Sequence, residues 1–264
     1  MSLDWLDEVD GLLIDLDGTV YEHGKPFEGV QEVIDGLLNR YNVLFLTNTD
    51  SKNKQSLMDY YYRIGLNLPE EKVYSVPEFA KKYLLENNLS AYFVVTEELE
   101  DYFHEVKKDD FTPDVVIVGD IRGRSDLQDR LNKALRCLKR GAELYVLQKG
   151  ITYVSSSGLA LDSGSYGMLL ENASGKKLKV MGKPNKDFIL DGCKKLGIEP
   201  DHACLIGDDI EADILGAKSI GAKGVLVKTG RYDPEIVESY EENGVVPDAT
   251  IENFLKIVDL FPID

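Results

Sequence analysis

The sequence has few cysteines and no arrangement of them that indicates a disulfide framework or a zinc site. Cys137, Cys193 and Cys204 form no Cys-x-x-Cys pair, and the three histidines match no motif. Isolated cysteines of this kind are usually buried and behave as small hydrophobic residues. We therefore expect structural cysteines and a protein of the reducing cytoplasm.

Basic residues and long apolar runs are also scarce. The chain has 30 Lys and Arg against 47 Asp and Glu, a net charge of −17. A body this acidic repels nucleic-acid backbones. The apolar stretches are as short as Val115–Val118 and cannot span a bilayer, and Met1–Asp10 lacks the basic-then-apolar order of a secretion signal. We expect no nucleic-acid and no membrane partner.

What the sequence does have is a regular alternation of short apolar runs with helical patterns. Between several of the runs, apolar residues recur with a period near 3.6, as they do over Asp126–Arg140. This rhythm predicts an α/β fold with parallel sheets covered on both faces. The runs that we interpret as strands are Gly11–Asp17, Asn42–Asn48, Ala91–Thr96, Asp114–Asp120, Ala142–Gln148, Ala203–Asp209 and Gly224–Gly230.

The length of 264 residues fits either one large domain or two modest ones. Pro77 is expected to open a helix. Gly182-Lys183-Pro184 predicts a tight turn with Pro184 in the first turn of a helix that runs from Asn185 to Leu196. Boundaries near Ser75–Pro77 and near Val180 follow from these signals.

Two aspartates follow the first predicted strand. Asp15 and Asp17 are two residues apart, so on an extended chain they face the same point. Ligands in open parallel sheets bind beyond the carboxyl ends of strands, and two carboxylates this close need either a proton or a cation between them. The alternative for Asp17-Gly18 is an ordinary turn.

A second acidic cluster, Asp208, Asp209 and Asp213, follows the strand at Ala203. Oxygen ligands without His or Cys favour Mg²⁺ over zinc. The alternative is helix capping, which suits Asp209 but not all three residues.

A third strand ends in Thr47-Asn48, where hydroxyl, amide and backbone N–H groups could hold phosphate oxygens. Read alone, this pair would more often be a helix cap. Lys183 supplies the cation that a phosphate site needs beside paired carboxylates, although a lone lysine before proline is otherwise ordinary surface.

Taken in chain order, these residues resemble the four motifs of the haloacid dehalogenase (HAD) superfamily of phosphatases, which read DxDGT, then S/T, then K, then GDxxxxD. Here they stand as Asp15-Leu16-Asp17-Gly18-Thr19, Thr47-Asn48, Lys183-Pro184 and Gly207-Asp208 through Asp213. The gap between the second and third motifs is similar to that of the NagD-like branch. The resemblance implies a doubly wound, Rossmann-like core of residues 1–76 and 181–264, with an inserted α/β cap of residues 77–180.

The resemblance also implies a role for each motif residue. Asp15 would be the nucleophile that becomes a phosphoaspartate. Asp17 would be the acid and base, and its backbone carbonyl would join Asp15 and Asp208 in binding Mg²⁺. Thr47, Asn48 and Lys183 would hold the phosphoryl oxygens. Asp209 and Asp213 would lie in the outer shell and orient Lys183 or metal-bound waters.

The expected function is therefore that of a Mg²⁺-dependent phosphomonoester hydrolase acting on a small phosphorylated metabolite. A phosphotransferase or mutase of the same fold and a non-catalytic phosphate-binding regulator remain alternatives. Within Lys149–Gly167, we expect Lys149 and Tyr153 to contact the non-phosphate part of the substrate; a solvated Ser/Gly loop is the alternative. A homodimer is one expected assembly.

Overall fold

The computed structural model describes residues 4–155 and 158–263 of the chain. Two compact units make up the chain. The first contains Met1–Thr47, Met58–Tyr74 and Lys183–Asp264, and the second contains Asn48–Leu57 and Ser75–Gly182. Among the described residues, no helix combines the length and the apolar character needed to cross a bilayer.

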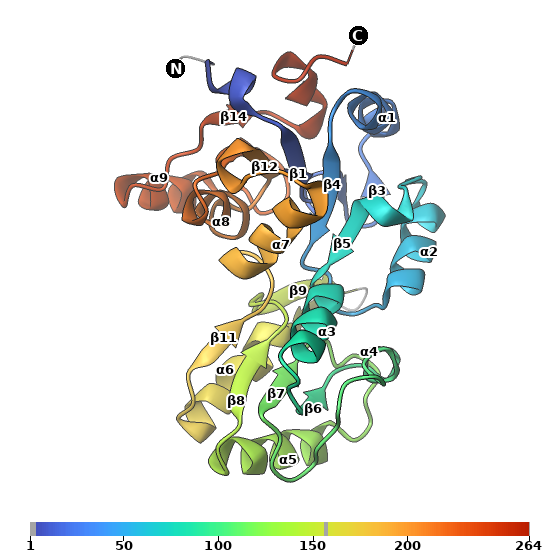
Figure 1. Cartoon of the computed structure of the whole chain (residues 1–264), viewed down its shortest axis with the longest axis vertical. Coiled ribbons are helices and arrows are strands. Elements are labelled where there is room, and N and C mark those ends of the chain that lie inside the picture. Colours follow the sequence, from blue (N-terminus) through green and yellow to red (C-terminus); the bar gives the residue numbers. More distant parts are fainter. Residues whose placement is uncertain (1–3, 156–157, 264) are drawn as a thin grey trace. The chain divides into compact units, whose positions relative to one another are not determined.

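A six-stranded sheet forms the centre of the first unit, with the order β14-β13-β12-β1-β4-β5 (Figure 1). The pairs from β14 through β4 are all parallel. The strands are β1 (Gly11–Ile14), β4 (Val43–Thr47), β5 (Val73–Ser75), β12 (Ala203–Gly207), β13 (Lys223–Val227) and β14 (Ala249–Ile251). A small hairpin joins β2 (Tyr21–Glu22) to β3 (Lys25–Pro26).

The strand order places a topological switch point at β1. From β1 the chain moves through β4 to β5 on one side, and it later returns to β12, β13 and β14 on the other side. Every residue of β1, β4 and β12 is buried, because both faces of the sheet are covered. The predicted doubly wound parallel sheet is therefore confirmed, and its switch point is where such sheets bind ligands.

Helices follow most strands of the first unit. Helix α7 contacts β1 and β4, and it packs beside α8, which contacts β13. The helical elements are α1 (Val30–Arg40), α2 (Lys54–Ile64, which spans the division between the units), α7 (Lys186–Leu196), a π-type turn at Ile210–Leu215, α8 (Gly216–Ser219) and α9 (Pro234–Glu242). Short 3-10 turns lie at Asp4–Glu8, Glu70–Lys72, Pro200–His202 and Phe254–Asp259.

The second unit has its own parallel sheet, with the order β11-β8-β7-β6. Its strands are β6 (Ala91–Val94), β7 (Val115–Val118), β8 (Glu143–Val146) and β11 (Leu178–Val180). An antiparallel hairpin of β9 (Thr152–Ser155) and β10 (Gly158–Leu161) forms a separate sheet. A large α/β cap within the chain is thus confirmed.

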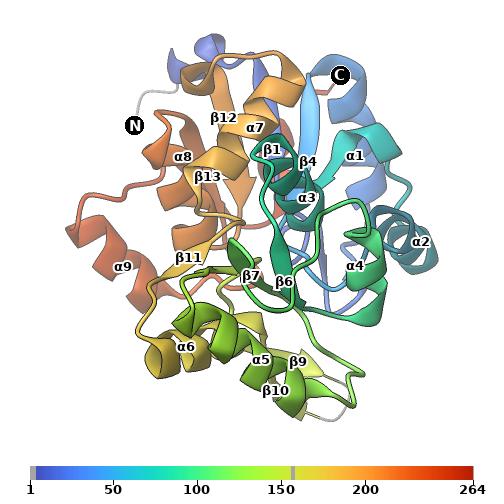
Figure 2. The same cartoon turned by 60° about the horizontal axis from the view of Figure 1, so that its bottom comes forward.

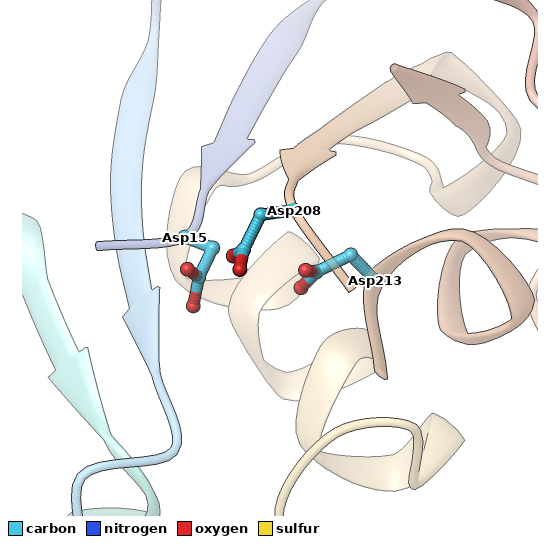
Figure 3. Close-up of side chains that lie close together, drawn as sticks. All are labelled: Asp15, Asp208 and Asp213. Carbon is cyan, nitrogen blue, oxygen red and sulfur yellow. The ribbon is translucent and has the colours of Figure 1, made fainter. Parts of the chain in front are cut away.

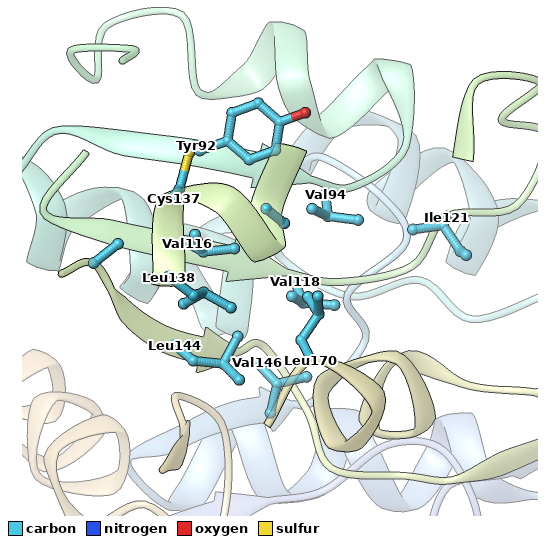
Figure 4. Packing of buried hydrophobic residues seen from close by; sticks show 12 residues of the cluster. Tyr92, Val94, Val116, Val118, Ile121, Cys137, Leu138, Leu144, Val146 and Leu170 are labelled. Carbon is cyan, nitrogen blue, oxygen red and sulfur yellow. The ribbon is translucent and has the colours of Figure 1, made fainter. Parts of the chain in front are cut away.

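Two helices cover one face of that sheet. Helices α5 (Leu127–Lys139) and α6 (Ser163–Ser174) lie side by side (Figure 2). The buried side chains between helices and strands form one apolar cluster that includes Val116, Val118 and Leu138 (Figure 4). Two further helices, α3 (Val76–Glu86) and α4 (Glu97–Tyr102), complete the unit. The cap therefore has a hydrophobic core of its own.

One local expectation needs correction. Pro184 is not in the first turn of a helix: it precedes Asn185, which caps α7, and the Lys183–Pro184 peptide is cis. The alternative of a solvated loop for Lys149–Gly167 does not describe the whole stretch, because it contains strands β9 and β10 and the start of α6.

Candidate active site

Two aspartates extend from neighbouring strands at the switch point. Asp15 follows β1, Asp208 follows β12, and the Asp15 N–H donates to the Ile206 carbonyl at 2.9 Å, which keeps the two strand ends in register. Carboxylate oxygens of Asp15, Asp208 and Asp213 lie within 4.8 Å of one another, and all three residues are buried. Figure 3 shows the carboxylates of Asp15 and Asp208 beyond the ends of their strands, with that of Asp213, from the helical turn after β12, beside them.

Lys183 lies between two of the carboxylates. Its ammonium donates to Asp15 Oδ1 and to Asp213 Oδ1, each at 2.6 Å, and the residue is only 2% exposed. Burial lowers the pKa of Lys183, but the charges of Asp15 and Asp213 outweigh burial and raise that pKa above its ordinary value. The lysine therefore stays charged and holds one oxygen of Asp15.

The other oxygen of Asp15 faces Asp208. The Thr19 hydroxyl lies 3.1 Å from Asp15 Oδ2 and 3.0 Å from Asp208 Oδ1. A hydroxyl has one proton and can donate to only one carboxylate at a time. Burial, followed by the charges of Asp15 and Asp213, raises the pKa of Asp208 well above its usual range. These oxygen atoms are suitable ligands for a hard divalent cation. Such a cation would neutralise the repulsion between the carboxylates of Asp15 and Asp208, which the Thr19 hydroxyl alone does not.

Asp213 and Asp209 meet across the π-type turn that follows β12. Asp209 caps this turn by accepting the N–H groups of Glu211 and Ala212 at 2.9 Å, and its own N–H donates to Asp213 Oδ2 at 3.1 Å. Asp213 is thus bonded through one oxygen to Lys183 and through the other to the Asp209 backbone. A Cβ on Gly207 would lie 2.1 Å from Asp213 Oδ2, so this approach requires glycine.

Asp17 differs from the other acids because it is exposed to solvent as a residue. The protein around its carboxyl still disfavours the charged form, and together with the charge of Asp15 it raises the pKa of Asp17 to about 6. The guanidinium of Arg231 acts in the opposite direction. A carboxyl with this pKa can give and take a proton near neutral pH.

The remaining predicted residues lie at the second motif and in the cap. Thr47 ends β4, two residues beyond Phe45, which pairs with Ile14 of β1, and it is 1% exposed. Asn48 is the next residue and belongs to the second unit, as do Lys149 and Tyr153. The Tyr153 ring lies 4.7 Å from the Arg122 guanidinium. Hydrogen bonds, some through Thr19, connect five of the predicted site residues: Asp15, Lys183, Asp208, Asp209 and Asp213. Asp17 and Thr47 belong to the same unit.

Two contributors to this arrangement were not predicted from the sequence. One is the Thr19 hydroxyl. The other is the segment Thr229–Arg231, part of which was expected to be strand and whose last residue donates its backbone N–H to Asp208 Oδ2 at 2.6 Å. The position of Thr229 and Gly230 after a predicted strand could have indicated this role. The strand is β13, which is parallel to β12, so the carboxyl ends of the two strands lie side by side.

Comparison with known proteins gives matches along most of the chain. A family model described as haloacid dehalogenase-like hydrolase matches residues 12–108, and a HAD-hydrolase-like model matches residues 180–256. A relative from Xenopus laevis, named phospholysine phosphohistidine inorganic pyrophosphate phosphatase, is 32% identical over 265 residues. The match covers 97% of this chain and 96% of the relative.

Solved structures show the same architecture. A 4-nitrophenylphosphatase from Thermotoga maritima superposes with a TM-score of 0.85 at 25% identity, covering 98% of this chain and 99% of that one. NagD from E. coli K-12 superposes with a TM-score of 0.83 at 22% identity, covering 93% and 97% of the respective chains. The second likeness concerns the fold alone.

Proposed function

The chain belongs to the haloacid dehalogenase-like hydrolase family, and we propose that it is a Mg²⁺-dependent phosphomonoester hydrolase of the NagD-like branch that works through an aspartyl phosphate. The phosphatase names of its relatives support the reaction class. The metal, the covalent step and the residue roles are supported by the geometry of the first unit.

One observation carries the proposal: the two oxygens of Asp15 have different partners. Oδ1 accepts from Lys183 at 2.6 Å, and Oδ2 faces Asp208 Oδ1 across the Thr19 hydroxyl. A nucleophilic carboxylate needs this asymmetry, since a fixed cation holds the group in place while a cation at the other oxygen neutralises the incoming phosphoryl charge.

Asp15 and Asp208 would hold the Mg²⁺ by their side chains, together with the backbone carbonyl of Asp17. When bound, the metal would supply charge stabilisation for the phosphoryl oxygens. Asp213 is already bonded to Lys183 and to the Asp209 backbone, so its role here is to hold Lys183 beside Asp15.

In the first step, a carboxylate oxygen of Asp15 forms a bond to phosphorus while the ester P–O bond breaks. Asp17 gives its proton to the departing oxygen. In the second step, Asp17 takes a proton from water as the water oxygen bonds to phosphorus, and the bond between phosphorus and Asp15 breaks to release phosphate. Thr47, Asn48 and Lys183 would hold the phosphoryl oxygens in both steps.

The substrate class that we propose is a small phosphorylated metabolite, and the cap would select its non-phosphate part. Residues 77–180 form the cap in this account, with Lys149 and Tyr153 as its contacts with the substrate. The name of the Xenopus relative adds inorganic pyrophosphate to the compounds worth testing.

The first test is phosphate release from 4-nitrophenyl phosphate with added Mg²⁺ and after exhaustive chelation with EDTA. We expect turnover that chelation abolishes and added Mg²⁺ restores. A screen across sugar phosphates, nucleotides, phosphoglycolate, glycerol phosphate and pyrophosphate would then rank substrates by kcat/KM. Full activity after chelation would contradict the role of the metal.

A further inference from the structure

The segment Thr229–Arg231 lies outside all four family motifs, yet it contacts two of them. It follows β13, the neighbour of β12 in the sheet, and leads to α9, which is capped by Asp233. The Tyr232 N–H donates to the Thr229 carbonyl at 3.0 Å, so the segment is a tight turn of defined geometry. Its polar groups are directed at residues of the proposed site.

The first contact is with the turn after Asp17. The Thr229 hydroxyl donates to the Gly18 carbonyl at 2.5 Å, and 211 residues separate the two partners. Gly18 adopts a φ of 89°, a conformation that side-chain-bearing residues rarely adopt. The hydroxyl thereby holds the Gly18–Thr19 peptide unit, between the proposed acid and base and the Thr19 hydroxyl.

The second contact is with Asp208. The Arg231 N–H donates to Asp208 Oδ2 at 2.6 Å, while the Thr19 hydroxyl lies 3.0 Å from Oδ1, so both carboxylate oxygens have a partner. A fixed backbone N–H directed at a carboxylate favours its charged form, which is the form that binds a metal, and a partner on each oxygen restricts rotation of the group. The carboxylate plane of Asp208 is therefore set from the β13 side of the site.

Gly230 makes both contacts sterically feasible. A Cβ at this position would lie 2.1 Å from Asp208 Oδ2 and 2.5 Å from the Gly18 Cα, so the backbone approaches both residues more closely than any side chain would allow. The φ of 56° at Gly230 also favours glycine.

We propose that Thr229–Arg231 is a positioning element of the metal site, which fixes the Asp208 carboxylate and the Asp17–Gly18 turn before the metal binds. This inference rests on the proposed Mg²⁺-dependent function. Groups that orient metal ligands typically change metal affinity by about 10- to 100-fold when they are removed. A turn that only supported the fold would change the stability of the protein and leave the affinity of the folded protein unchanged.

The test uses Thr229→Val, which removes the hydroxyl at nearly constant volume, and Thr229→Ser, which keeps it. Isothermal titration of the metal-free full chain with Mg²⁺ alone is expected to show about 10-fold weaker binding for Thr229→Val. Thr229→Ser should retain an affinity close to that of the wild type. Thr250→Val, at an exposed position in β14, is the matched control and should bind as the wild type does.

A second measurement needs no variant. Addition of Mg²⁺ to the isotope-labelled wild type should shift the amide resonance of Arg231, because this N–H donates to a proposed metal ligand. The Ser90 N–H, which donates to Asp114 Oδ2 at 2.8 Å in the second unit, is a control of the same bond type and should not shift.

The inference is overturned if folded Thr229→Val binds Mg²⁺ as tightly as the wild type. If that variant does not fold, the inference is overturned when added Mg²⁺ does not shift the Arg231 amide resonance of the wild type. In both cases, Mg²⁺-dependent hydrolysis by the wild type would leave the proposed function intact. A wild type that neither binds Mg²⁺ nor hydrolyses any phosphomonoester would contradict both.

Discussion

The ammonium of Lys183 lies 2.6 Å from Oδ1 of Asp15, although 168 residues separate them in the chain. The bond joins the segment before the cap to the segment after it, and both segments belong to the first unit. The site therefore forms only when these two distant parts of the core fold together. The buried charge of Lys183 then offsets the repulsion between the carboxylates of Asp15 and Asp213.

Replacing this charge should destabilise the protein. At pH 8, Lys183→Met leaves Asp15 and Asp213 buried without their cation, and we expect the free energy of unfolding to fall by about 3–5 kcal/mol in urea titrations. Adding Asp213→Asn removes one of the two stranded charges and should restore part of the loss, while activity stays absent. A Lys183→Met protein as stable as the wild type would show that the bonds from Lys183 to Asp15 and Asp213 contribute little to the free energy of unfolding.

Asp208→Asn should weaken metal binding without unfolding the protein. The amide keeps the shape of the carboxylate but loses its charge, so the affinity for Mg²⁺ measured by calorimetry should fall by more than about 10-fold. The melting temperature of the metal-free protein should not fall, because burial raises the pKa of Asp208 and makes its charged form costly. Asp201→Asn, an exposed position, serves as the control. Unchanged Mg²⁺ affinity would remove Asp208 from the ligand set.

Asp50→Asn should stabilise the protein increasingly as pH rises. Asp50 is 5% exposed and accepts from the Ser163 hydroxyl at 2.5 Å, and burial raises its pKa well above its usual range. The folded state then binds a proton that the unfolded state has released above about pH 4, so wild-type stability falls as pH rises, by up to about 1.4 kcal/mol per pH unit. An asparagine has no such proton to lose.

The measurement is the difference in free energy of unfolding between Asp50→Asn and the wild type at pH 5 and at pH 8. The free energy of unfolding of Asp50→Asn, relative to that of the wild type, should be larger at pH 8 than at pH 5. Asp59→Asn, at an exposed position, should show no such dependence on pH. Equal differences at both pH values would mean that Asp50 is ionised in the folded protein.

Substitutions in the cap should change substrate choice more than chemistry. Lys149→Ala and Tyr153→Ala are expected to alter the ranking of substrates by kcat/KM, with the smallest effect on a compact aryl phosphate. Tyr153 also faces the Arg122 guanidinium at 4.7 Å, so Tyr153→Phe, which keeps the ring, should behave more like the wild type. Equal losses of kcat/KM on every substrate would mean that Lys149 and Tyr153 support the fold and do not select the substrate.

The sequence predicted the parallel sheets well because buried strands have a strong local signature. The runs at Gly11, Asn42 and Ala203 all contain strands, and the helix expected at Asp126–Arg140 is α5, flanked by those two residues as its caps. Several predicted strands extend beyond the observed ones: the run at Gly11 was expected to reach Asp17, whereas β1 ends at Ile14 and the side chains of Asp15 and Asp17 belong to the site.

The contacts between distant segments could not be read from the sequence. Thr229 contacts Gly18 across 211 residues, and Asp50 contacts Ser163 across 113 residues. The residues next to Thr229 and Asp50 in the sequence do not indicate these partners. Each partner comes from a distant segment, and its position depends on the tertiary fold. The error at Pro184 has a local cause: Asn185, the next residue, caps the helix by accepting the Asp187 N–H, so the proline lies before the cap.

The most direct test of the account is a pre-steady-state measurement on Asp17→Asn with 4-nitrophenyl phosphate. Nitrophenolate is a good leaving group that needs little help from an acid, whereas hydrolysis of the phosphoenzyme needs Asp17 to activate water. The account predicts a burst of nitrophenolate approaching one equivalent per active site. Borohydride trapping and peptide mass spectrometry should then place the phosphoryl adduct on Asp15, and Asp15→Asn should show neither burst nor adduct. Steady turnover without a burst, or an adduct on another residue, would contradict Asp15 as the nucleophile.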